Sequence, residues 1–188
     1  MAMPKYFFCC GFVFLLLMLD SSPSQAKDLA PPGFQWQTCK QAGCSFLVPQ
    51  GWSFEGEQNR GVQKYQMIPP LHNRKITPLV RVNILQHTEV RTGMSAQRHM
   101  ELFMGELDRS GKVLEVWNNT SGSLTSTAAM SLHFTRADQA VKKFSLLIRN
   151  QKTGTLYVFT FETMPHYWEQ DWPVVEQIFT RLRLDEEV

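Results

Sequence analysis

The sequence predicts an α+β fold in which an antiparallel β-sheet is flanked by helices, as in an α/β/α sandwich. Two features of the chain indicate this class. Strand-length segments follow one another through short turns, which is typical of antiparallel pairing. Two further segments repeat apolar residues at helical spacing, and a helix with one apolar stripe buries that stripe against a neighbouring layer.

Several strand segments are predicted before the first helix. They cover residues 34–38, 45–48, 52–54, 61–68 and 79–85. Pro49-Gln50-Gly51 supplies a turn between the second and third segments, and Pro69-Pro70 ends the fourth. The fifth segment alternates, with Val80, Val82 and Ile84 on one face.

The first helix is predicted to begin after Ser95 and to end before Gly111. The hydroxyl of Ser95 suits an N-cap, because it can accept a hydrogen bond from a free N–H of the first turn, and Gly111 suits a stop. The residues between them form one apolar stripe: Ala96, Met100, Phe103, Met104 and Leu107. This stripe predicts the helix face that packs on the sheet.

Four strand segments are predicted after this helix. They cover residues 113–117, 130–136, 144–149 and 156–162, and a polar loop is expected over 118–127. The alternation in 130–136 points Met130, Leu132 and Phe134 inward, and Ser131, His133 and Thr135 outward. A hairpin loop with Gly154 joins the last two strands. The last strand is apolar on both faces, which predicts a central position in the sheet.

A second helix is predicted near the end of the chain, within residues 166–184. Pro173 cannot donate a backbone hydrogen bond in a helix interior, so the main helix is expected to start near Asp171 or Trp172. Its apolar stripe consists of Val174 or Val175, Ile178, Phe179 and Leu182.

Residues 1–26 read as a cleaved signal peptide, with a positive Lys5, an apolar run and a Ser24-Gln25-Ala26 cleavage site. Cleavage leaves a single predicted domain, 27–188, of 162 residues (188 minus 26). No later apolar stretch is long enough to span a membrane. The net charge of +2 excludes an electrostatic case for nucleic-acid binding. We therefore expect a periplasmic or secreted protein.

Cys39 and Cys44 are the only cysteines after residue 26, and we expect them to form a disulfide. Gly43 allows the tight turn that a small ring requires. Free thiols are one alternative, and a metal or redox role is another. Four residues separate the cysteines, whereas redox motifs use Cys-x-x-Cys and structural zinc needs four ligands.

The motifs of the chain resemble the PsbP-like and DcrB-like superfamily of exported proteins, which includes the Mog proteins. "FLVPQGWSF" (46–54) looks like its strand followed by a Pro-x-Gly-Trp turn, and "RNQKTGTLYVFTFET" (149–163) looks like its long hairpin. "WPVVEQIFTRLRL" (172–184) is similar to its closing helix. The resemblance implies an α/β/α sandwich that serves as a protein-binding or assembly module, and it implies no reaction.

No catalytic, cofactor or metal site is predicted from the residues. The histidines lack ligand spacing, and no nucleophile or phosphate-binding motif is present. Tyr167, Trp168 and Trp172 lie close together before a helix, and they are the predicted partner surface. We expect a non-enzymatic module that binds another envelope or secreted protein. The alternative is a small-ligand or metal-binding protein, or a hydrolase, that uses a pocket between sheet and helix.

Overall fold

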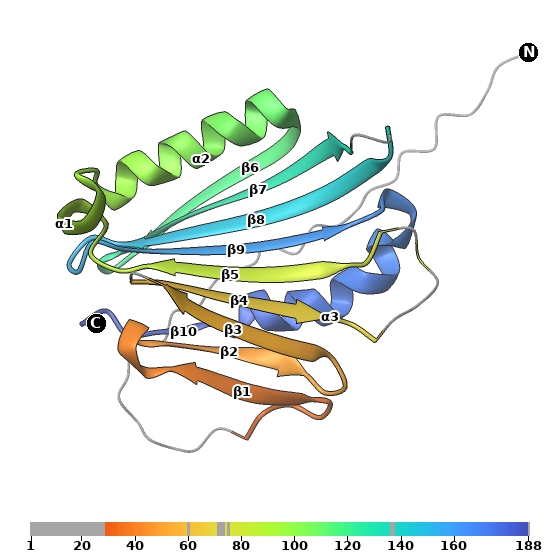
Figure 1. The fold of residues 1–188 in the computed structure, drawn as a ribbon, viewed down its shortest axis with the longest axis horizontal. Coiled ribbons are helices and arrows are strands. Elements are labelled where there is room, and N and C mark those ends of the chain that lie inside the picture. Colours follow the sequence, from red (N-terminus) through yellow and green to blue (C-terminus); the bar gives the residue numbers. More distant parts are fainter. Residues whose placement is uncertain (1–28, 60, 71–73, 75, 136–137, 188) are drawn as a thin grey trace, which may run out of the picture.

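Two antiparallel sheets organise the chain in the computed structural model, which describes residues 29–187 apart from 60, 71–73, 75, 136 and 137 (Figure 1). The strands are β1 (Phe34–Cys39), β2 (Cys44–Pro49), β3 (Ser53–Asn59), β4 (Val62–Ile68), β5 (Leu79–Leu85), β6 (Gly111–Ser121), β7 (Leu124–Phe134), β8 (Ala140–Asn150), β9 (Thr155–Thr163) and β10 (Arg183–Leu184). The helices are η1 (Lys40–Ala42), α1 (Thr88–Thr92), α2 (Ala96–Ser110), η2 (Pro165–Tyr167) and α3 (Trp168–Thr180). The predicted signal peptide, residues 1–26, lies outside the described part of the chain.

The larger sheet has the order β3-β4-β5-β9-β8-β7-β6, and the smaller one has the order β1-β2-β10. Helix α2 covers part of one face of the larger sheet. Helix α3 and the smaller sheet pack against the opposite face, where most of the core lies (Figure 1). The predicted α+β class with helices on the sheet faces is confirmed.

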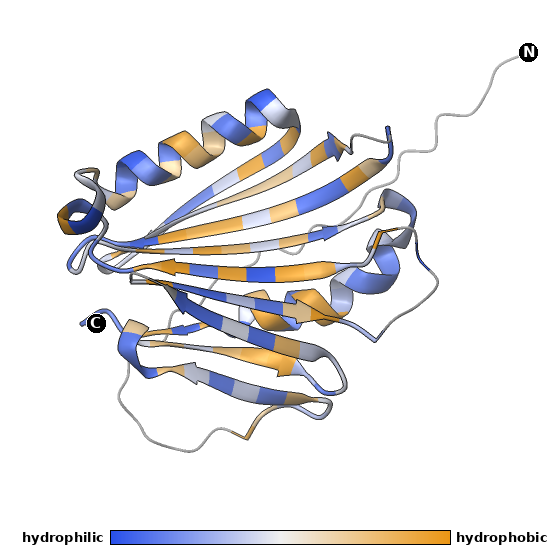
Figure 2. Cartoon of the chain, viewed as in Figure 1, coloured by the Kyte–Doolittle hydropathy of each residue, from blue (hydrophilic) through white to orange (hydrophobic). Residues whose placement is uncertain are grey.

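The alternation of β5 decides which of its faces enters this main core, as Figure 2 shows along the strand. Val80, Val82 and Ile84 are fully buried, and they lie beside Phe161, Phe159 and Tyr157 of β9 in the antiparallel register. Burying an aliphatic or aromatic side chain of this size contributes about 1.5–3 kcal/mol. The β5–β9 pair is therefore the centre of the core.

The predictions for α2 and β9 are confirmed. The hydroxyl of Ser95 accepts a hydrogen bond from the Arg98 N–H at 3.2 Å, and the helix ends at Ser110. Ala96 and Met100 are buried against β8 and β9, and Leu107 is buried as well. All residues of β9 but one are buried, as expected for a central strand with both faces covered.

The polar loop predicted over residues 118–127 is wrong. These residues form the ends of β6 and β7, joined by a tight turn in which Gly122 has φ +57°. Pairing of β7 with β8 over eleven residues extends the hairpin beyond its apolar part. The backbone bonds of the ladder therefore override the turn preference of Asn, Ser and Gly.

In β7 the exposure predicted for Ser131 and Phe134 is wrong, whereas Met130 is buried as predicted. Ser131 is fully buried, and Phe134, which was expected inside, is 61% exposed. Both faces of this strand are covered in its middle, so that polar alternation no longer marks a solvent face. Phe134 is the last residue of the strand.

Helix α3 begins at Trp168, earlier than predicted, and runs through Pro173. The early start places Trp168 and Trp172 one turn apart on the same side of the helix, with their rings stacked at 5.1 Å. Both rings pack against Phe161. This aromatic packing offsets the single backbone hydrogen bond that Pro173 cannot donate. The helix also ends before residues 183–184, which form β10 instead.

Candidate functional site: a tryptophan and proline groove

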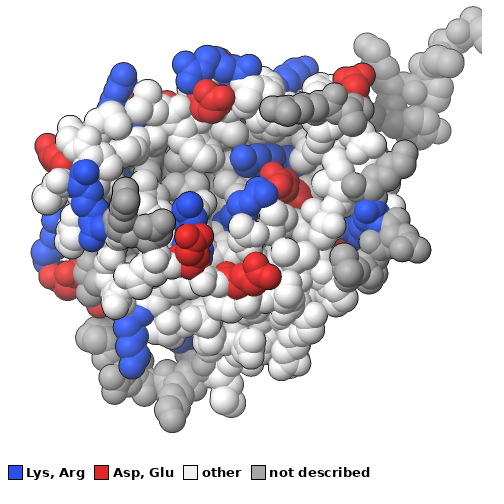
Figure 3. Space-filling view, viewed as in Figure 1, with Lys and Arg blue, Asp and Glu red and all other residues white. Residues whose placement is uncertain are grey.

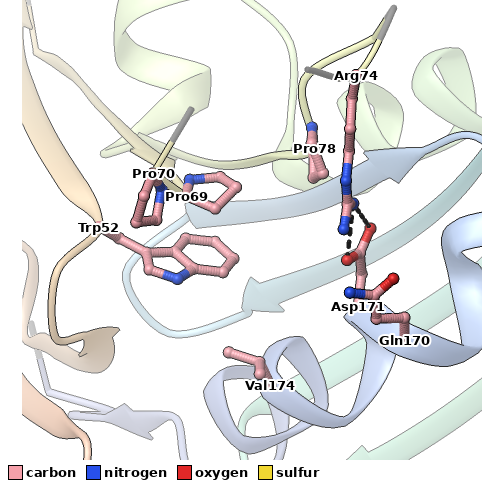
Figure 4. Close-up of a pocket in the computed structure, with 8 residues that line it drawn as sticks. All are labelled: Trp52, Pro69, Pro70, Arg74, Pro78, Gln170, Asp171 and Val174. Carbon is pink, nitrogen blue, oxygen red and sulfur yellow. Dashed lines mark hydrogen bonds and ion pairs between the residues drawn. The ribbon is translucent and has the colours of Figure 1, made fainter. Parts of the chain in front are cut away.

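A groove opens where β4 ends and β5 begins, against the first turns of α3 (Figure 4). Its lining consists mainly of rigid apolar side chains with a polar end: Trp52, Pro69, Pro70, Arg74, Pro78, Gln170, Asp171 and Val174. Its volume is about 180 Å³. Small-molecule sites typically span roughly 300–1,000 Å³, so this groove fits one side chain of a larger partner better than a whole ligand.

The walls of the groove follow from local sequence. Gly51 adopts φ +79°, which a residue with a side chain rarely tolerates, and the turn that it makes places Trp52 at the entrance of β3. The backbone N–H of Trp52 donates to the carbonyl of Pro49 at 3.3 Å. Pro69 and Pro70 follow β4 directly, because prolines cannot continue its ladder of hydrogen bonds.

The polar end of the groove is a shielded ion pair between Arg74 and Asp171 (Figure 4). One nitrogen of Arg74 donates to both carboxylate oxygens, at 2.9 and 2.7 Å. The hydroxyl of Thr163 donates to the same carboxylate at 2.8 Å. The Arg74 guanidinium also lies 4.1 Å from the centroid of the Tyr167 ring. The side chains of Arg74 and Asp171 are only 9% and 12% exposed, so both charges are largely shielded from water.

This arrangement is suited to binding and not to acid–base catalysis. Asp171 carries three hydrogen bonds, and its charge is balanced by Arg74. A general base must come within reach of a substrate proton, whereas this carboxylate is held by Arg74 and Thr163 and its side chain is only 12% exposed. The polar end thus fixes the loop after β4 on α3 and gives the groove a rigid wall.

The predicted partner surface is corrected at Trp168. Its side chain is only 5% exposed, because the first turn of α3 points it at Phe161 in the core. Trp172 is partly buried and lies 4.9 Å from the Phe144 ring, between ring centroids. Tyr167 is also partly buried, and its ring packs against the Arg74 guanidinium. Of the segment that contains the predicted partner surface, Asp171 lines the groove and Tyr167 contacts Arg74 of its lining. Trp168 and Trp172 pack on the core side of this segment.

Sequence reasoning missed most of the groove. Trp52 was recognised only as part of a fold motif, and Pro69-Pro70 only as the end of a strand. Arg74 and Asp171 are 97 residues apart, and no local pattern pairs them. The one available signal was the aromatic and acidic character of the segment that contains Tyr167 and Asp171.

Comparison with known proteins identifies the fold. No known family and no curated protein matches the sequence. The solution structure of cyanobacterial PsbP (CyanoP) from Synechocystis sp. PCC 6803 superposes with a TM-score of 0.57 at 13% identity, over 84% of this chain and 96% of that one. The chain has the PsbP-like fold.

Two further structures share the PsbP-like fold with this chain. LpqN of Mycobacterium tuberculosis has a TM-score of 0.54 at 10% identity, over 80% of this chain and 90% of LpqN. PA94 of Pseudomonas aeruginosa has a TM-score of 0.51 at 9% identity, over 79% of this chain and 94% of PA94. Identities of this size show a common fold. The resemblance inferred from the sequence motifs is confirmed at that level.

Within this PsbP-like domain, Cys39 and Cys44 lie directly opposite each other in the β1–β2 register, and both are buried as thiols. A hydrogen bond from Cys44 lowers the pKa of Cys39, while the same bond together with burial raises the pKa of Cys44. Residues paired across an antiparallel ladder lie close enough for a disulfide. The predicted disulfide therefore stays a prediction that the backbone permits.

The hydrolase alternative requires a serine beside a histidine. Among the described residues, the hydroxyls of Ser131 and Ser110 both lie near the His133 ring, and the Ser110 hydroxyl is 3.4 Å from Nδ1. The Ser131 hydroxyl lies 2.7 Å from Nε2 of His133, and Nδ1 of His133 lies 3.2 Å from the Ser110 carbonyl oxygen. Burial lowers the pKa of His133. Ser131 itself is fully buried beneath α2, and both ring nitrogens of His133 already have partners. The pair is a satisfied structural contact.

No three or more His, Cys, Asp or Glu side chains gather among the described residues in a way that could hold a metal ion. No helix in the described ranges has the length and apolarity needed to cross a bilayer.

Proposed function

We propose that this PsbP-like domain is a non-enzymatic, exported module that binds another envelope or secreted protein through the groove around Trp52. The observation that carries the proposal is the groove itself: rigid tryptophan and proline walls enclose a space of about 180 Å³. A single apolar side chain or prolyl ring of a partner would fill this space. Tryptophan is among the residues that most often dominate protein–protein binding energy.

The side chain of Trp52 supports a polypeptide partner in a second way. It is partly exposed, and its indole N–H has no hydrogen-bond acceptor among the described residues. An indole at an interface typically packs its ring on an apolar group and donates its N–H to a polar one. A backbone carbonyl next to the inserted side chain would accept this hydrogen bond.

Export is the second component of the proposal. The predicted signal peptide, cleaved after Ala26, would deliver residues 27–188 to the periplasm or the medium. LpqN, one of the structures with the same fold, is described as involved in cell envelope biogenesis. N-terminal sequencing of the mature protein tests this component, and a mature chain that still starts at Met1 would overturn it.

Site-specific photocrosslinking tests the groove. A photoreactive phenylalanine analogue replaces Gln170, which is exposed and lines the groove. Gln97, exposed on α2 on the other face of the sheet, receives the same analogue as the matched control. We expect a discrete crosslinked adduct in the envelope fraction from position 170 and none from position 97. Adding Trp52→Ala is expected to abolish it. Equal adducts from both positions, or an adduct indifferent to Trp52, would overturn the proposal.

A further inference from the structure

A row of polar side chains crosses the larger sheet on the face that carries α2, away from the groove. Lys143 and Ser145 point to this face from β8, and Thr160 and Glu162 lie beside them on β9. Arg81 of β5 lies opposite Thr160. Figure 3 shows positive and negative side chains next to one another in the middle of this face, below α2. Helix α2 roofs only part of the row, so the row is enclosed on one side and open on the other.

Lys143 is a half-buried ammonium that forms no hydrogen bond or close ion pair among the described residues, although the Glu162 carboxylate attracts it from the neighbouring strand. In the register it lies between Ser131 of β7 and Glu162 of β9. Glu162 forms its ion pair with Arg81 instead, at 2.8 Å. The Lys143 nitrogen also lies 5.7 Å from the centroid of the Phe103 ring of α2. Burial lowers the pKa of Lys143, as expected for a charge held partly away from water.

Ser145 is a fully buried hydroxyl next to this ammonium. Its oxygen has no hydrogen-bond partner among the described residues. Across the ladder its neighbours are Ala129 and Thr160. A buried polar group without a partner costs free energy, and native proteins retain few of them. Lys143 and Ser145 are two residues apart on one strand, so their side chains emerge on the same face roughly 7 Å apart.

We propose that Lys143 and Ser145 form a binding site for a small oxyanion, a carboxylate or phosphate group, between β8 and α2. Both side chains are donors that lack acceptors, and an oxyanion supplies several acceptors at once. The charges of Arg81, Lys143 and Glu162 sum to +1 (two positive, one negative), which favours an anion. The anion enters at the open side beside Lys143 and reaches Ser145 at the closed end. The Phe103 ring forms the roof.

A titration of the mature protein with two named probes tests this site. Inorganic phosphate and acetate are added separately at constant ionic strength, with chloride as the balancing ion, and backbone amide shifts are followed by NMR. We expect saturable shifts in β8 and α2 with at least one probe. The probe that saturates at lower concentration identifies the group as phosphate or carboxylate. Absence of saturation with both probes would overturn the inference.

Four variants sharpen the test. Lys143→Met is expected to weaken the affinity by about tenfold or more, because it removes a charged donor, and Ser145→Ala by a smaller factor. Lys64→Met is the matched control, since Lys64 is exposed on β4 of the same sheet. If Lys64→Met lost as much affinity as Lys143→Met, the effect would be unspecific screening and the site would be disproved. Should Lys143→Met fail to fold, an unchanged affinity in Ser145→Ala overturns the site. Trp52→Ala is expected to leave the anion affinity unchanged, which separates this site from the groove.

Discussion

Replacing Asp171 by alanine tests the polar end of the groove most directly. The variant removes the acceptor of two contacts from Arg74 and one from Thr163. Arg74 would then remain largely shielded from water, 9% exposed, with the Tyr167 ring beside its charge. Removing one partner of a buried ion pair typically costs 3–5 kcal/mol. Since both side chains keep some contact with solvent, we expect the lower end, about 3 kcal/mol.

Two further variants divide that loss into its parts. Thr163→Val removes one hydrogen bond to the carboxylate and is expected to cost about 1 kcal/mol. The double variant Arg74→Met with Asp171→Leu leaves no unpaired charge, so it is expected to cost less than Asp171→Ala alone. This order of losses is characteristic of a desolvated pair. A hydrated pair would show no such order.

Denaturant unfolding followed by tryptophan fluorescence measures these losses, because Trp168 and Trp172 lie in the adjacent part of α3. Glu106→Ala is the control, since the Arg109–Glu106 pair is 71% and 64% exposed and is expected to contribute less than about 1 kcal/mol. The reasoning is refuted if Asp171→Ala loses no more than Glu106→Ala. It is also refuted if the double variant is less stable than Asp171→Ala.

Three other outcomes are expected. Thiol labelling of the exported protein under non-reducing conditions should find no free thiol at Cys39 or Cys44. Because the disulfide would close a short loop, its reduction should lower the free energy of unfolding by about 2 kcal/mol. Full labelling of the native protein would contradict the disulfide. Burial lowers the pKa of His133 below its ordinary 6.5, so the unfolded state binds more protons at acidic pH and stability falls as the pH drops through about 6.5. His133→Gln should flatten that part of the unfolding midpoint plotted against pH, and an unchanged slope would assign it to other groups. Phe134→Ser should change stability by less than about 0.5 kcal/mol, whereas Phe144→Ala should cost about 3 kcal/mol; equal losses in thermal unfolding would contradict the exposure of Phe134.

The sequence correctly predicted the strands and helices in which the spacing of apolar residues matches the face that is buried. In β5 one face is fully buried and the other carries Arg81 and Asn83, and the period of two was correct at Val80, Val82 and Ile84. Helix α2 carries both a capping serine and a complete apolar stripe, so its bounds were correct at each end. In these elements local preference and tertiary contacts agree.

The errors fall where tertiary contacts override local preference. The β6–β7 hairpin continues through a polar stretch, because its backbone hydrogen bonds pair it with β8. Helix α3 continues through Pro173, because Trp168 and Trp172 stack on each other and on Phe161. Neither the pairing of a distant strand nor the packing of a distant ring appears in a local window of sequence.

The groove could not have been predicted either, because it is formed by segments that are far apart in the sequence. Its walls come from the turn before β3, the prolines after β4 and the first turns of α3. Each of these segments has a local explanation as a turn, a strand end or a helix start. Only the fold places Arg74 beside Asp171. The aromatic segment around Tyr167 borders this groove, although Trp168 lies in the core, and its role as a partner surface stays a prediction.

The two proposed sites meet at the end of β9. Thr163 points to the face of the groove and holds Asp171, while Glu162, the residue before it, points to the other face and holds Arg81 beside Lys143. Successive residues of a strand face opposite sides, so the sites share a backbone and no side chain. Because β9 is buried on both faces and paired on both edges, it cannot shift toward one site without breaking contacts at the other. An effect of Lys143→Met on crosslinking at position 170 would therefore report a movement of β9 itself, and its absence would establish β9 as a rigid partition between a protein-binding groove and an anion site.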